Sequence, residues 1–249
     1  MNLRFPPALR FRDYRIFWLG LFLSVIGSQM QLIAVNWHIY ELLRGQTLTL
    51  NILGRSIDLG AEALGLGTLG LVRVIPIVLF ALVGGMLADT RNRRTLLFYA
   101  EIAAALMAGT LGVLTLLGRE SVLVIYLFTA ALSAVAAFEN PSRQSLVPHL
   151  VPPEHFSNAV SVQTLTWTTA AILGPALAGL LVAYIDTGYV YIINALSFLA
   201  VVVSLLLMNY RGKVAASSAG LGLGALLDGL RFVFRTPIIS STMLLDFIA

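Results

Sequence analysis

Long apolar runs, separated by short polar segments, form the repeating pattern of this chain. The runs cover about residues 14–42, 66–84, 95–117, 121–138, 158–185 and 189–208. A helix needs roughly 20 mostly apolar residues to cross a bilayer, and each run is close to that length or longer. The pattern therefore predicts six membrane-spanning helices.

The overall composition agrees with a membrane protein. The 249 residues are 58% hydrophobic and only 11% charged, whereas about a quarter of the residues are charged in soluble globular domains. The net charge of +4 is spread over short polar segments without a basic helix face, so it indicates no nucleic-acid partner. We therefore expect an all-α integral membrane protein surrounded by the lipid bilayer.

The polar segments predict the connections between the helices. Residues 43–62 are expected to form a long outer loop with a short surface helix. Residues 85–94 are expected to form a tight hairpin between the second and third helices, with Asn92 in the left-handed conformation that such a turn needs. A polar loop that holds four prolines is expected between the fourth and fifth helices.

Three regions are expected along the chain. Residues 1–210 would form a six-helix membrane domain, and residues 211–237 a cytoplasmic linker with an amphipathic surface helix. Residues 238–249 begin a seventh apolar run that is too short to cross a bilayer. We therefore expect the sequence to be a fragment that stops inside a span.

Basic residues predict the orientation in the membrane. Arg91, Arg93 and Arg94 stand together after the second helix, and four further arginines precede or begin the first helix. Short segments rich in arginine or lysine remain on the cytoplasmic side. We therefore expect a multi-pass protein of the inner (cytoplasmic) membrane, with its N-terminus in the cytoplasm.

Two charged residues fall inside the predicted spans. Arg73 lies near the middle of the second helix, where a charge is costly unless it faces protein or water. It could bind an anionic substrate or take part in proton coupling, or it could be a structural arginine that caps helix carbonyls near Pro76 or extends toward the surface. Glu101 of the third helix could bind and release a proton, or it could be a shallow residue paired with an arginine of residues 91–94.

Uncharged polar residues also occur inside the predicted spans. Ser28 and Gln31 belong to a set of four polar residues at helical spacing in the first helix, and Thr164 and Trp167 belong to a polar stretch in the fifth. Polar residues of membrane helices face the bundle interior or a water-filled path. These side chains could line a substrate cavity, or they could only hydrogen-bond neighbouring helices.

The sequence carries no recognisable catalytic or metal-binding constellation. Gly65, Gly67 and Gly70 spell G-x-G-x-x-G, but a membrane span follows them and no strand precedes them, so they fit helix packing instead of a nucleotide site. The three histidines lack metal-ligand spacing, and the chain contains no cysteine. We therefore expect neither an enzyme nor a bound metal or cofactor.

The segment after the second helix resembles the loop signature of the major facilitator superfamily. Gly85, Asp89, Arg93 and Arg94 match the pattern G-x-x-x-D-[RK]-x-G-R-[RK]. The chain departs from the pattern at two positions, where threonine replaces the basic residue and asparagine replaces the glycine. In that family the aspartate and arginines form a latch between two halves of the protein on the cytoplasmic side.

Two further stretches narrow the resemblance. In the fifth helix, Gly174, Pro175 and Gly179 lie in a segment similar to the antiporter signature g-x-x-x-G-P-x-x-G-G, which marks exporters more than importers. Residues 140–151 look like a segment of the drug-antiporter branch that includes enterobactin and macrolide exporters. Because an acid at the end of the fourth helix assists the latch in the family, the resemblance places Glu139 there, with Arg143 beside it.

The resemblance also implies a function. The family has twelve spans in two six-helix halves, with the substrate route between them. We therefore expect the N-terminal half of an exporter of a small drug-like or siderophore-like molecule, driven by the proton motive force and partnered by a missing C-terminal half. An uptake permease for a small metabolite, a non-transporting membrane scaffold and a half-length subunit are the alternatives.

Overall fold

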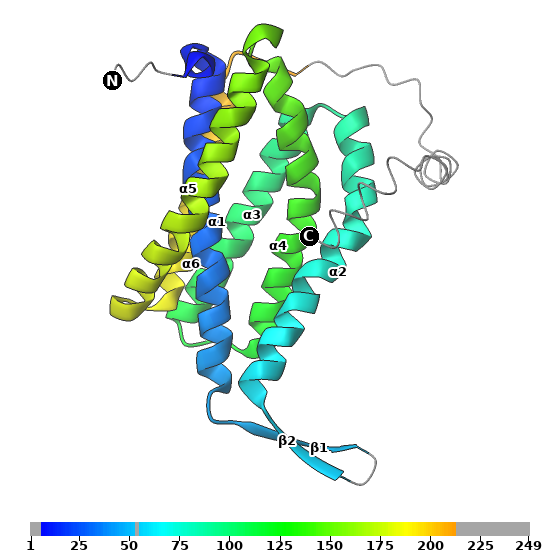
Figure 1. Cartoon of the computed structure of the whole chain (residues 1–249), viewed down its shortest axis with the longest axis vertical. Coiled ribbons are helices and arrows are strands. Elements are labelled where there is room, and N and C mark those ends of the chain that lie inside the picture. Colours follow the sequence, from blue (N-terminus) through cyan, green and yellow to red (C-terminus); the bar gives the residue numbers. More distant parts are fainter. Residues whose placement is uncertain (1–5, 53–54, 213–249) are drawn as a thin grey trace, which may run out of the picture. The chain divides into compact units, whose positions relative to one another are not determined.

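The protein forms a bundle of six long helices (Figure 1). The computed structural model describes residues 6–52 and 55–212. The helices are α1 (Arg12–Leu43), α2 (Ala61–Thr90), α3 (Arg93–Leu116), α4 (Val122–Leu146), α5 (Phe156–Tyr184) and α6 (Thr187–Leu207). All six contain segments long and apolar enough to cross a membrane, which confirms the predicted all-α membrane bundle.

Two predicted regions cannot be compared with this bundle. The linker at 211–237, apart from its first two residues, and the partial seventh span at 238–249 lie outside the described residues. Short 3-10 turns at Pro7–Arg10, Val147–His149 and Pro153–His155 connect to the helices within the described part.

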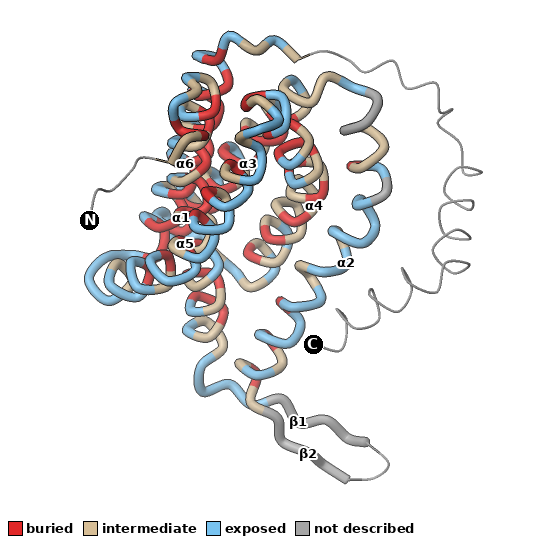
Figure 2. The backbone as a smooth tube through the Cα atoms, turned by 45° about the horizontal axis from the view of Figure 1, so that its top comes forward, coloured by how far each residue is buried: buried red, intermediate tan, exposed pale blue. Residues whose placement is uncertain are grey.

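The core of the bundle lies between α1, α3, α4 and α6. Helix α6 packs against α1 and α3, α4 packs against α2 and α3, and α5 packs against α1. Figure 2 shows that α2 and much of α5 are exposed along their length, whereas buried residues concentrate on α1, α3 and α6. The exposed side chains of α2 and α5 are mostly large and apolar, including Leu71, Val78 and Leu180, as expected for surfaces that do not face water.

Small residues allow several close helix contacts. A Cβ atom added at Gly27 of α1 would overlap the side chains of Asn194 and Ser197 in α6. A Cβ atom at Gly174 of α5 would overlap Gln29 of α1. Glycine therefore sets the distance between these helices, in the manner common for membrane bundles.

Another close contact joins α2 to α4. A Cβ atom added at Gly84 would overlap the backbone carbonyl oxygen of Ala137. That carbonyl stands four residues before Pro141, which has no N–H to donate to it. Gly84 therefore packs against a carbonyl group that lacks its usual helical donor.

The prediction of a surface helix in residues 43–62 is wrong. The chain forms an antiparallel hairpin there, with β1 (Thr47–Ile52) paired to β2 (Arg55–Gly60) in the register Thr47 opposite Gly60. Figure 1 shows the hairpin at the end of the bundle where α1 ends and α2 begins. Leucine and isoleucine alternate with other residues in both segments, which is the period of a strand.

The predicted turns around α2, α3 and α4 also need correction. Helix α2 continues to Thr90, so only Arg91 and Asn92 separate it from α3. Asn92 has a φ angle of −64° and is not left-handed; its side chain caps α3 by accepting hydrogen bonds from the N–H groups of Arg94 and Thr95. Helix α4 likewise continues through Pro141 to Leu146, where a loop was expected after residue 138.

Candidate substrate cavity and buried ion cluster

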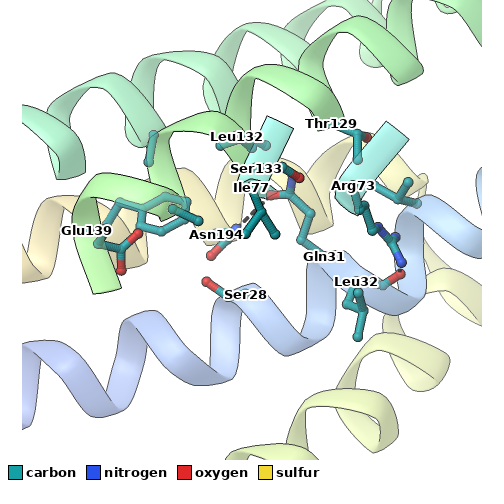
Figure 3. Close-up of a pocket in the computed structure, with 14 residues that line it drawn as sticks. Ser28, Gln31, Leu32, Arg73, Ile77, Thr129, Leu132, Ser133, Glu139 and Asn194 are labelled. Carbon is teal, nitrogen blue, oxygen red and sulfur yellow. Dashed lines mark hydrogen bonds between the residues drawn. The ribbon is translucent and has the colours of Figure 1, made fainter. Parts of the chain in front are cut away.

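A cavity of about 270 Å³, with both apolar and polar side chains in its wall, lies between the helices of the bundle. Residues from α1, α2, α3, α4 and α6 line it. Its polar lining consists of Ser28, Gln31, Arg73, Thr129, Ser133, Glu139 and Asn194. Figure 3 shows Glu139 at one end of the cavity and Arg73 at the other. Three of the predicted candidates, Ser28, Gln31 and Arg73, therefore share one cavity.

A buried amide pair forms part of the cavity wall. The Nδ2 atom of Asn194 in α6 donates to Oε1 of Gln31 in α1 at 2.6 Å, and Ser197 donates its hydroxyl to the Asn194 side chain at 2.9 Å. Asn194 was missed by the sequence analysis, although it is the one amide in the otherwise apolar segment 187–207. Gly27 leaves the space that these side chains occupy.

Arg73 makes a structural contact and also lines the cavity, and its role in substrate binding or proton coupling stays a prediction. Its Nη2 atom donates to the backbone carbonyl of Leu32 in α1 at 3.3 Å, which is the structural role. The same side chain lines the cavity. Its positive charge is therefore fixed by α1 at the cavity wall.

Three charged side chains form a buried cluster next to the cavity. Arg143 in α4 pairs with Glu139, one turn earlier in the same helix, and its Nη2 atom lies 3.9 Å from Oε1 of Glu101 in α3. Glu101 is completely buried. The arginine that approaches it is therefore Arg143 and not one of residues 91–94, which corrects that pairing.

Trp167 and Thr164 lie away from the central cavity. Both line a second hollow of about 370 Å³ beside α5, with Gln144 and Gln163. The ring of Trp167 lies 5.8 Å from the guanidinium carbon of Arg143, close enough for a cation–π contact. Thr164 donates its hydroxyl to Val160 of its own helix. Trp167 is thus linked to the ion cluster, and Thr164 is not placed with Ser28 and Gln31.

The two arginines of the loop signature bind the ends of other helices. Arg93 donates to the carbonyl of Ser145, near the end of α4, at 3.4 Å, and contacts His149 at 2.6 Å. Arg94 donates to the carbonyl of Leu205, near the end of α6, at 2.9 Å. The last carbonyls of a helix lack intrahelical donors and carry partial negative charge, so both arginines stabilise helix C-termini.

Other residues of the predicted latch are placed differently. The side chain of Asp89 lies outside the described part. A Cβ atom at Gly85 would meet nothing within 4 Å. Glu139 and Arg143 bind each other inside the bundle, and their role in a latch stays a prediction.

The glycines of the fifth-helix signature also differ from each other. Gly174 makes the close contact with α1 described above, and Pro175 follows it inside α5. A Cβ atom at Gly179 would meet nothing within 4 Å among the described residues. Of these two glycines, Gly174 therefore makes the close approach expected from small residues and Gly179 does not.

Six membrane-length helices around a cavity that contains charged and polar side chains are typical of a multi-pass membrane protein of the transporter type. A family model described as transmembrane secretion effector matches residues 56–248. The chain therefore belongs to this family of major facilitator superfamily transporters, and not to an enzyme family.

Three curated proteins resemble the chain, with sequence identities between 23% and 26%. It is 26% identical over 193 residues to the MFS-type transporter YfiS of Bacillus subtilis, with 76% of this chain and 45% of that protein covered. It is 24% identical over 198 residues to the multidrug efflux pump Tap of Mycolicibacterium fortuitum, with 76% and 48% covered. It is 23% identical over 198 residues to the staphyloferrin A transporter of Staphylococcus aureus, with 79% and 46% covered.

The similarity covers only part of the length of each relative. The chain spans less than half the length of these relatives. No solved structure matches the chain significantly.

Proposed function

We propose that this chain supplies the N-terminal half of a proton-coupled exporter of a small drug-like or siderophore-like molecule in the cytoplasmic membrane. The observation that carries the proposal is the central cavity, which holds a carboxylate at one end and a guanidinium at the other inside an apolar bundle (Figure 3). Charged residues inside a membrane bundle are costly, and they are typical of substrate and proton pathways. Two relatives whose names refer to multidrug efflux and to a siderophore support the substrate class.

The proposed transport cycle needs a second half. The exposed apolar surfaces of α2 and α5, together with the length of the relatives, support a partner domain packed against this one. Alternating access would then follow from rocking of the two halves around the cavity.

The direct test is transport by cells that express the complete gene. Cells with the gene are expected to accumulate several-fold less ethidium than cells without it, and a protonophore is expected to remove the difference. Ser28→Phe should reduce efflux strongly because it places a ring in the cavity, whereas Leu23→Phe, on the exposed side of the same helix, should not.

Other results would favour the alternatives. Equal ethidium and siderophore levels with and without the gene would support a non-transporting scaffold. Higher accumulation in expressing cells would support an uptake permease. Efflux that persists fully in the presence of the protonophore would contradict proton coupling.

The proposed orientation places the turn between α2 and α3 in the cytoplasm. The chain has no cysteine, so a single introduced cysteine can report its side of the membrane. We expect Asn92→Cys to react with a membrane-impermeant maleimide only after the cells are permeabilised, because arginine-rich turns stay inside. Arg119→Cys, in the exposed turn after α3, is expected to react with intact cells. The opposite labelling pattern would contradict the orientation.

A further inference from the structure

The cluster of Glu101, Arg143 and Glu139 connects a buried carboxylate to the cavity. The Arg143 side chain is 6% exposed and the Glu101 side chain 0%. Glu139 contacts Arg143 and also lines the cavity. Arg143 therefore stands between one acid that faces the cavity and one acid that is enclosed by protein.

The charges of this cluster do not balance when both acids are ionised. Two carboxylates and one guanidinium leave one negative charge, and a buried net charge costs several kcal/mol. Helices α5 and α6 contain no Asp, Glu, Lys, Arg or His that could compensate it. Arg93 and Arg94 of α3 bind the carbonyls of Ser145 and Leu205 instead.

The remaining helices offer no second counter-ion among the described side chains. On α1 the titratable and charged residues lie in the first turn or near its last turns, at Arg12, Asp13, Tyr14, Arg15, His38, Tyr40 and Glu41. On α2, Glu62 lies in the first turn and Arg73 binds Leu32 at the far end of the cavity (Figure 3). The tyrosines of α3, α4 and α6 carry no positive charge, and His149 of the turn after α4 contacts Arg93. Among the described side chains, the cluster therefore has only its own members to balance this charge.

Hydrogen bonding indicates where a proton would reside. Neither carboxylate oxygen of Glu101 has a hydrogen-bond partner among the described residues, and Nε of Arg143 also has none. Glu139, in direct contact with the guanidinium, has its charge compensated. An ionised Glu101 would be an under-compensated buried charge, whereas a protonated Glu101 leaves a neutral Arg143–Glu139 pair.

We propose that Glu101, Arg143 and Glu139 form a single-proton site, and that a positively charged ligand bound beside Glu139 releases its proton. The ligand would compensate the charge of Glu139, and Arg143 would then pair with Glu101. Glu101 loses its proton to water in this step, so one positive charge enters as one leaves and the net charge is unchanged. This coupling to the cavity rests on the proposed transport function, whereas the proton site itself does not.

Infrared spectroscopy of the complete protein in lipid nanodiscs tests the site directly. At neutral pH, wild type is expected to show the C=O stretch of a buried carboxylic acid. Glu101→Gln should remove this band. Glu139→Gln should also remove it, because Arg143 then pairs with Glu101 and ionises it. Glu154→Gln, at an exposed glutamate, is the matched control and should keep the band.

Three results would count against the proposal. A wild-type protein without the band, or a band that survives Glu101→Gln, would exclude the proton from this site. Excess tetraphenylphosphonium is expected to diminish the band in wild type and to release a proton into weakly buffered solution; a band that persists would overturn the link to the cavity. Loss of the band in both variants of a protein that shows no efflux would support the proton site and contradict only the transport function.

Discussion

Gly84→Ala is expected to destabilise the helix bundle, whereas Gly85→Ala, one residue further along the same helix, is not. A Cβ atom at position 84 would overlap the Ala137 carbonyl oxygen of α4, and a Cβ atom at position 85 would meet nothing within 4 Å. Overpacking of a close contact costs about 1–3 kcal/mol. Alanine otherwise favours a helix over glycine by about 1 kcal/mol, so the adjacent variant should be neutral or slightly stabilising.

The measurement is the unfolding of each purified variant in detergent, followed by circular dichroism during heating or titration with a denaturing detergent. The pair controls for helix propensity, because both changes are glycine to alanine in α2. Equal stability of the two variants would show that α2 and α4 do not approach as closely at Gly84 as the structure has them. A larger side chain, as in Gly84→Leu, should enlarge the difference.

Sequence reasoning predicted the bundle well because the membrane imposes one dominant rule. A span must be apolar and long enough to satisfy its backbone internally, and six runs meet that rule. The same rule says little about where each helix begins and ends. Asn92 was expected to be left-handed, but it caps α3 instead, since short polar side chains serve both purposes. The hairpin at 47–60 was missed because its strand period was overlooked beside much longer helical runs.

The candidate site was predicted only in part for a related reason. Ser28 and Gln31 were found because their spacing places them on one helix face. Glu139 was placed at the end of the fourth helix and Arg143 in the polar loop after it, because the apolar run ends at residue 138. If the helix had been continued through Pro141, the four-residue spacing of Glu139 and Arg143 would have predicted that they pair. The approach of Glu101 depends on how α3 packs against α4, and helical periodicity in one sequence does not contain that information.

The largest effect on stability is expected from Arg143→Met. Methionine removes the guanidinium and leaves the carboxylate of Glu139 buried without its counter-ion, next to the Glu101 side chain. Removal of one partner from a buried ionic cluster costs about 3–5 kcal/mol. We therefore expect Arg143→Met to fold poorly, with a large loss of stability in the same detergent titration. Arg119→Met, at an exposed turn, should be close to wild type.

A triple variant can show whether this loss of stability comes from unpaired buried charge or from altered packing. In the triple variant Glu101→Gln, Glu139→Gln, Arg143→Met, every charge of the cluster is removed, and the side chains keep a similar volume. Replacement of a whole buried ionic cluster by uncharged residues is often neutral or stabilising, so the triple variant should regain most of the stability that the single variant loses. A triple variant as unstable as Arg143→Met would instead assign the loss to packing around the guanidinium, including its contact with Trp167.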